Sequence, residues 1–134
     1  MNKKILFVCK YNRFRSKIAE EIFNKLNRNN RNRAKSAGII RGSPIDPIQR
    51  ETCKKLGIVL RGTPKGISTS LLKWQNMIVI VGDDIPSELF KDNKKYGKKL
   101  LIWKIPDSKT NNKKEIIRIV KRIENKVKRL IKEV

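Results

Sequence analysis

The chain has 134 residues, no histidine, and 34 lysines and arginines against 12 acidic residues, which gives a formal charge of +22. The length predicts one domain over residues 1–134, and the lack of any apolar run of about 18 residues predicts no membrane span. The absence of histidine excludes Ser-His-Asp and Cys-His catalysis and argues against a zinc site, so we expect neither a metal nor another cofactor.

The first third of the chain predicts a strand, a helix and a second strand. Residues 3–8 form a short continuous apolar run, which is typical of a buried strand. Apolar residues then recur at helical spacing over 16–26, and Ser16 is the expected N-cap of that helix. The polar stretch that follows ends the helix. Residues 34–37 predict a short strand that Gly38 closes.

The middle of the chain predicts two helices and a strand. Asp46 precedes a proline, the pattern of an N-cap with proline at the first helical position, and the helix should run over 47–56. Gly57 is the expected stop. Ser68 begins a short helix or turn, and residues 77–81 predict another buried strand.

The last third predicts one more strand and a long helix. Residues 86–91 favour a short helix, and the charged stretch from there to Lys99 reads as a loop. Residues 100–103 predict the last strand, and a polar loop leads from it through Asn112. The final helix carries one apolar stripe, with lysines and arginines on the other face. The stripe consists of Ile116, Ile117, Val120, Ile123, Val127, Leu130 and Ile131.

Strands that alternate with helices predict an α/β fold with a parallel sheet and helices on both faces. Four strands, the first of them ending in a loop with ligand-binding residues, match the flavodoxin-like strand order 2-1-3-4. Ligands of such sheets bind beyond the carboxyl ends of the strands. Cys9 and Asp107 both follow predicted strands, so both should lie on that rim.

The loop after the first predicted strand has the composition of an anion site. Cys9 and Arg15 are six positions apart, with Ser16 next. Backbone N–H groups of such a loop and the N-terminus of the following helix bind anions, and a guanidinium matches two phosphate oxygens. A thiolate is a good nucleophile, and Ser16 could donate a hydrogen bond to it. We predict that seven residues bind phosphate: Lys10, Tyr11, Asn12, Arg13, Phe14, Arg15 and Ser16.

Cys9 as a small buried core residue is the alternative interpretation of the same loop. The strand before it and the amphipathic helix after it favour the anion site, because such motifs depend on their structural context. Asn12 also tolerates the left-handed backbone that a tight loop needs.

A series of short motifs extends in order across most of the chain: Ile5-Leu6-Phe7-Val8-Cys9, Asn12, Arg15-Ser16, Ala19-Glu20, Ser36-Ala37-Gly38, Pro44, Asp46-Pro47, Leu56-Gly57-Ile58 and Ile105-Pro106-Asp107. These residues resemble low-molecular-weight protein tyrosine phosphatases, whose fold and loop the thioredoxin-coupled arsenate reductases share. The resemblance implies a phosphomonoester hydrolase that forms a phosphocysteine on Cys9, with Asp107 as the general acid and then the general base. Asp83 and Asp84 follow a different strand and are rival or supporting carboxylates.

Several positions differ from that family's pattern. Tyr11 stands where glycine is usual, so either the backbone there avoids positive φ or it is strained. Phe14 replaces a second cysteine of the loop, and Lys17 replaces proline. The aromatic residues that flank the substrate ring are missing at 40–41 and at 108–110. We expect Tyr11 to replace one wall of the pocket and Arg13 and Lys10 to make its rim cationic, which predicts a phosphorylated protein or a small anionic phosphomonoester as substrate.

Two other functions compete with ester hydrolysis. An arsenate reductase of the same fold needs further cysteines, and only Cys53 remains, in a predicted helix with half-buried packing. A non-catalytic phosphate binder could instead act through its basic surface, which favours non-specific contact with nucleic acid. The aromatic residues are few and are not interleaved with the basic ones, unlike in nucleic-acid modules. We expect a cytoplasmic location, because a nucleophilic thiol must stay reduced.

Overall fold

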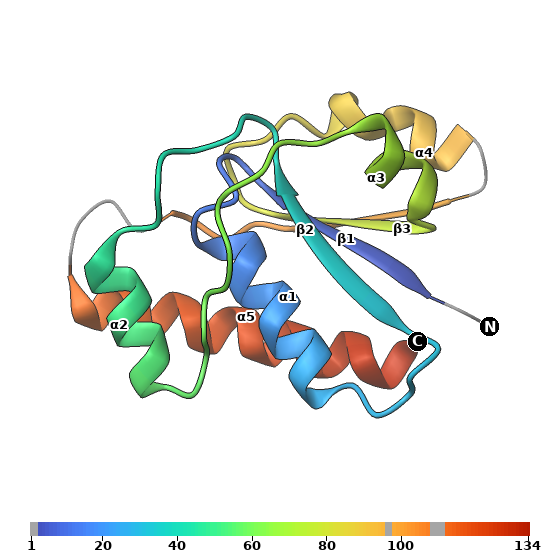
Figure 1. Ribbon diagram of the computed structural model, residues 1–134. Helices are drawn as coiled ribbons and strands as arrows, with labels where there is room; N and C mark the ends of the chain where they lie inside the picture. The colour runs from blue at the N-terminus through green and yellow to red at the C-terminus, as the bar shows by residue number, and fades with distance from the viewer. Residues whose placement is uncertain (1–2, 96–97, 108–111) are drawn as a thin grey trace.

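The computed structural model describes residues 3–95, 98–107 and 112–134 (Figure 1). Four parallel strands form one sheet in the order β2-β1-β3-β4, which confirms the predicted order 2-1-3-4. The two inner strands consist almost entirely of buried apolar residues, as expected for strands that are covered on both faces. The strands are β1 (Lys4–Cys9), β2 (Arg33–Gly38), β3 (Met77–Val81) and β4 (Lys99–Trp103).

Helices cover both faces of this sheet. In Figure 1, α1, α2 and α5 lie below it, while α3 and α4 lie above it. No helix in the described part of the chain is long and apolar enough to cross a membrane. The helices are α1 (Arg15–Leu26), α2 (Pro47–Lys55), α3 (Thr69–Trp74), the 3-10 helix η1 (Ser87–Phe90), α4 (Lys91–Lys95) and α5 (Lys113–Glu133).

The sheet divides the core into two apolar clusters, because successive side chains of a strand point to opposite faces. Ile5 and Phe7 of β1 belong to the larger cluster, which includes the buried stripes of α1 and α5. Leu6 and Val8 belong to the smaller cluster, where Phe90 covers the other face. β1 is therefore anchored on both sides, and its last residue, Cys9, is held at the carboxyl edge of the sheet.

Most predicted elements are confirmed, and two details are wrong. Asp46 caps α2, since its carboxylate accepts a hydrogen bond of 2.8 Å from the N–H of Ile48. Ser16 is not an N-cap: α1 begins at Arg15, and the hydroxyl of Ser16 contacts the thiol of Cys9 instead. The charged stretch after residue 91 is not all loop, because Lys91–Lys95 forms α4.

Candidate active site

The loop between β1 and α1 turns sharply around Asn12. Asn12 has a φ of 55°, and no other described non-glycine residue has a positive φ, so Tyr11 carries no left-handed strain. The backbone N–H of Asn12 donates to Cys9 Sγ over 3.3 Å. Gly38 lies against the outside of the loop, where a Cβ would come within 2.7 Å of the backbone of Tyr11 and Asn12. A glycine at the end of β2 therefore permits the loop to close.

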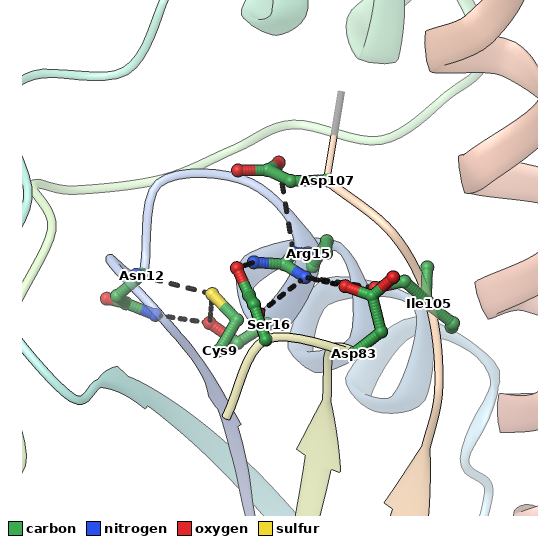
Figure 2. Close-up of polar contacts among 8 residues, drawn as sticks. Cys9, Asn12, Arg15, Ser16, Asp83, Ile105 and Asp107 are labelled. Carbon is green, nitrogen blue, oxygen red and sulfur yellow. Dashed lines mark hydrogen bonds and ion pairs between the residues drawn. The ribbon is translucent and has the colours of Figure 1, made fainter. Parts of the chain in front are cut away.

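A chain of hydrogen bonds supports the thiol of Cys9 from behind (Figure 2). Cys9 Sγ lies 2.9 Å from Ser16 Oγ. The Asn12 amide donates to Ser16 Oγ over 2.8 Å and to Ser36 Oγ over 3.0 Å, and the Ser36 hydroxyl donates to Glu20 over 2.5 Å. Because Ser16 already accepts from Asn12, its own proton is available to Cys9, as a hydrogen bond to a thiolate requires.

Arg15 is almost completely buried, with 2% of its surface exposed, although it carries a charge. Its two terminal nitrogens donate to both carboxylate oxygens of Asp84 at 3.1 Å, and one of them also donates to the carbonyl of Ile105 at 2.9 Å. Its Nε lies 3.8 Å from a carboxylate oxygen of Asp107. Burial opposes the charge, but the bonds to Asp84 and the fields of Asp107 and Cys9 outweigh it and raise the pKa of Arg15.

These side chains meet at a small cavity of about 50 Å³ at the carboxyl end of β1. Figure 2 shows Asp107 across the loop from Cys9, with Arg15 between them. Lys10, Asn12 and Ser16 are not among the side chains that line the cavity. The lining side chains are Cys9, Tyr11, Arg13, Phe14, Arg15, Gln49 and Asp107.

The rim of the cavity carries fixed cations. Arg13 donates through two nitrogens to the carbonyl of Pro44, at 3.1 and 2.9 Å. The Lys10 ammonium lies 5.3 Å from the centre of the Tyr11 ring, within reach of a cation–π contact. The segment Ser108–Thr110, where the resemblance expects aromatic walls, lies outside the described residues.

Sequence reasoning missed Gln49, which lines the cavity from α2. The sequence pattern assigns Gln49 only to a helix. Cys9, which lines the same cavity, is 40 positions earlier in the chain. Asp84 was predicted only as a rival or supporting carboxylate, without a partner, and the structure pairs it with Arg15. Glu20 and Ser36 belonged to the family likeness, but no spacing rule connects them to Asn12.

Cys53 is fully buried in the larger apolar cluster, so the expectation of half-buried packing is wrong. Burial away from water raises the pKa of its thiol to about 12. No group of three or more histidine, cysteine or acidic side chains among the described residues could hold a metal ion.

Solved structures of the same fold cover nearly the whole chain. A low molecular weight protein tyrosine phosphatase from T. tengcongensis matches with a TM-score of 0.85 and 22% identity, over 99% of this chain and 100% of that one. The YwlE arginine phosphatase from Geobacillus stearothermophilus matches at 0.80 and 20%, over 98% and 92%. An arsenate reductase from Archaeoglobus fulgidus matches at 0.73 and 22%, over 95% and 98%.

These structures share the fold of the chain, and at such identities they show the fold alone. A comparison with curated proteins finds no match. The family model described as low molecular weight phosphotyrosine protein phosphatase matches residues 4–134, which include the loop and all of the cavity's lining. The chain therefore belongs to the low molecular weight phosphotyrosine protein phosphatase family.

Proposed function

We propose that this chain hydrolyses phosphate monoesters in two steps through a phosphocysteine on Cys9. The observation that carries the proposal is that one cavity brings together Cys9, Arg15 and Asp107. In the first step the Cys9 thiolate attacks phosphorus, the bond to the leaving oxygen breaks, and Asp107 in its acid form gives that oxygen a proton. In the second step water releases phosphate and Asp107 takes a proton back.

Arg15 and the N-terminus of α1 stabilise the negative charge of the transferring group. The first turn of α1 holds no acidic residue, and its free N–H groups favour an anion. Asp84 holds both terminal nitrogens of Arg15, which fixes the guanidinium before substrate arrives. Preorganised donors of this kind supply the largest share of most enzymatic rate gains.

Asp107 is a better candidate for the acid than its two rivals. Asp107 lines the cavity, whereas Asp83 and Asp84 do not. Both carboxylate oxygens of Asp84 accept hydrogen bonds from Arg15. Asp83 is 4.0 Å from Arg15, and about half of its side chain is exposed. A proton donor must reach the leaving oxygen, so position favours Asp107.

The cavity and its rim favour an anionic substrate over a plain aromatic one. Arg13 and Lys10 carry positive charge at the mouth, and Tyr11 supplies one aromatic wall. Ile40 is exposed and forms no opposite wall. We infer a phosphorylated protein with acidic surroundings, or a small anionic ester. Because YwlE is an arginine phosphatase of this fold, a phosphorylated arginine belongs in the substrate panel.

Arsenate reduction is disfavoured because Cys53 cannot take up the oxidation. Its thiol is fully buried among apolar side chains, and its pKa of about 12 leaves almost no thiolate.

A single reactive thiol without a partner to form a protective disulfide also needs a reducing compartment, and we infer the cytoplasm. The charge of +22 supports only non-specific contact with nucleic acid, which a titration with duplex DNA at rising salt would measure.

The test compares Asp107→Asn with a matched control, Asp83→Asn, on a series of aryl phosphates. We expect Asp107→Asn to lower kcat/KM, which reports the first step, by about 10² to 10⁴ for poor leaving groups and by less for good ones, because only poor leaving groups need a proton. Asp83→Asn should stay close to the unmodified protein, since Asp83 does not line the cavity.

Two results would contradict the proposal. One is normal hydrolysis by Asp107→Asn together with loss of activity in Asp83→Asn, which would move the acid to the other strand. The other is thiol oxidation that depends on arsenate, without hydrolysis of any ester or of phosphoarginine, which would favour a reductase.

A further inference from the structure

Gln49 lines the cavity, and its amide bonds to no other residue in the described part of the chain. It lies in the first turn of α2, only 9% of its surface is exposed, and it lines the cavity of Cys9. No hydrogen bond joins its carboxamide to another described residue. No described side chain has a sealed polar atom without a partner, so the amide atoms of Gln49 face space that a small molecule can enter.

The other buried amides of the described residues differ from Gln49 because they are paired. Gln75 and Asn93 exchange hydrogen bonds of 2.7 and 3.2 Å. Asn12 bonds to two serines, and Asn32 accepts from the backbone at 2.9 Å. The amide of Gln49 has no protein partner among these residues and its atoms are not sealed, so it is available to a molecule that enters the cavity.

The position of Gln49 indicates what it would contact. Five of the seven described lining residues come from the loop and the start of α1, between Cys9 and Arg15, and a phosphoryl group bound by the loop would lie among them. Among the described residues, only Gln49 and Asp107 reach the cavity from elsewhere in the chain. In-line displacement puts the leaving group, and later the attacking water, on the side away from Cys9, beside the proposed acid.

α2 holds Gln49 on a rigid support. Asp46 caps the helix at 2.8 Å, and the Arg50 guanidinium donates to the carbonyl of Leu60 over 2.8 Å. Precise placement of a functional group needs such a support. A long polar side chain that lines the cavity from a capped helix, with its amide unpaired, is suited to holding a small polar molecule.

We propose that Gln49 positions the water that hydrolyses the phosphocysteine, which rests on the proposed function of Cys9 and Asp107. The water oxygen forms a bond to phosphorus, the sulfur–phosphorus bond breaks, and its electron pair returns to Cys9 as thiolate. One water proton passes to Asp107, and Gln49 holds the water through a second hydrogen bond. One bond alone leaves water free to rotate, and a glutamine orients the attacking water in other phosphoryl-transfer enzymes.

The experiment is rapid-mixing kinetics with p-nitrophenyl phosphate, whose good leaving group makes the first step fast. Gln49→Leu keeps the volume and removes the hydrogen bond. We expect an unchanged rate of the initial burst of nitrophenolate and a steady-state rate lower by about tenfold or more. Phosphocysteine should accumulate, as measured by intact mass after acid quench. Glu51→Leu, on the exposed side of α2, is the control and should behave like the unmodified protein.

Gln49→Ala is the second variant in case leucine does not fold, and it should show the same slow second step. If both Gln49 variants keep the steady-state rate, or slow the burst and the steady state equally, the inference is overturned while the proposed function stands. If the unmodified protein shows no phosphocysteine on Cys9 in the same quench, the proposed function fails, and the inference fails with it.

Discussion

The two cysteines of the chain are equally hidden from solvent and have opposite surroundings. Cys9 is 2% exposed and Cys53 is 0% exposed. Cys9 ends a strand beside a cavity, with the Asn12 N–H and the Ser16 hydroxyl at its sulfur. Cys53 lies among apolar side chains, and burial raises its pKa to about 12. Thiol chemistry therefore depends on hydrogen-bond donors and a small opening rather than on exposed area.

Replacing each cysteine with serine should separate the two environments most strongly. Cys9→Ser should lower hydrolysis by a factor on the order of 10⁴ or more, because serine has no positioned base to activate it, and the protein should still bind phosphate. Cys53→Ser should leave kcat unchanged and lower the free energy of unfolding by about 1–3 kcal/mol, since a hydroxyl would be buried without a partner. Aryl phosphate kinetics and urea unfolding measure the two effects. Equal loss of activity in both variants would remove the distinction.

The positive side of the loop can be tested through two arginines. Arg15→Lys should lower kcat by about 10²–10³, because a lysine cannot hold Asp84 with two nitrogens and also face the transferring group. Arg13→Lys, at the exposed rim, is the matched control and should change KM for anionic substrates more than kcat. If Arg13→Lys lowered kcat as much as Arg15→Lys, the buried position of the Arg15 guanidinium would not explain its effect on the rate.

The sequence predicted the part of the site that is local in the chain. The β1–α1 loop contains Cys9, Asn12 and Arg15 within seven residues, so spacing together with the strand before the loop and the helix after it predicts an anion site there. The parallel sheet followed from the alternation of strands and helices, its order from the match to the flavodoxin-like order, and Asp107 follows a strand of that sheet and lies 3.8 Å from Arg15. Predictions of this kind succeed where a motif is short or where a topology rule connects two strand ends.

The remaining parts of the site depend on contacts between distant segments. The pairing of Asp84 with Arg15 joins residues 69 positions apart, and a carboxylate after a strand could equally have been the acid. Gln49 lines the cavity from the first turn of α2, and the spacing of residues within α2 does not tell which side of the helix faces the cavity. The complete burial of Cys53 follows from how α2 packs near α5, and the pattern of α2 by itself gives no such information.

Asn12 tests the backbone support of Cys9 with a smaller expected effect. Asn12→Ala removes the hydrogen bonds to Ser16 and Ser36 and leaves a positive φ that alanine disfavours, so kcat should fall by about ten- to a hundredfold. Asn12→Gly relieves only the backbone cost of about 1 kcal/mol. It should therefore recover thermal stability better than activity. Full recovery of activity in the glycine variant would show that the side-chain bonds contribute nothing to the thiol.

Alkylation with iodoacetamide tests the two thiols without any substitution. At pH 8 a thiol with a pKa of about 12 is ionised in roughly one molecule in ten thousand, so Cys53 should stay unmodified in the folded protein. Cys9 should be modified, and phosphate in the cavity should slow that reaction, as peptide mass analysis would measure. In denaturant both thiols should react, which controls for reagent quality. Burial raises the pKa of Cys53, so the fold is most stable while this thiol is protonated, at pH values below about 9. The protection of Cys53 from alkylation should therefore weaken only as the pH rises above about 9. Rapid modification of Cys53 in the folded protein at pH 8 would show that burial does not prevent its reaction. A difference in reactivity between Cys9 and Cys53 would then need another cause.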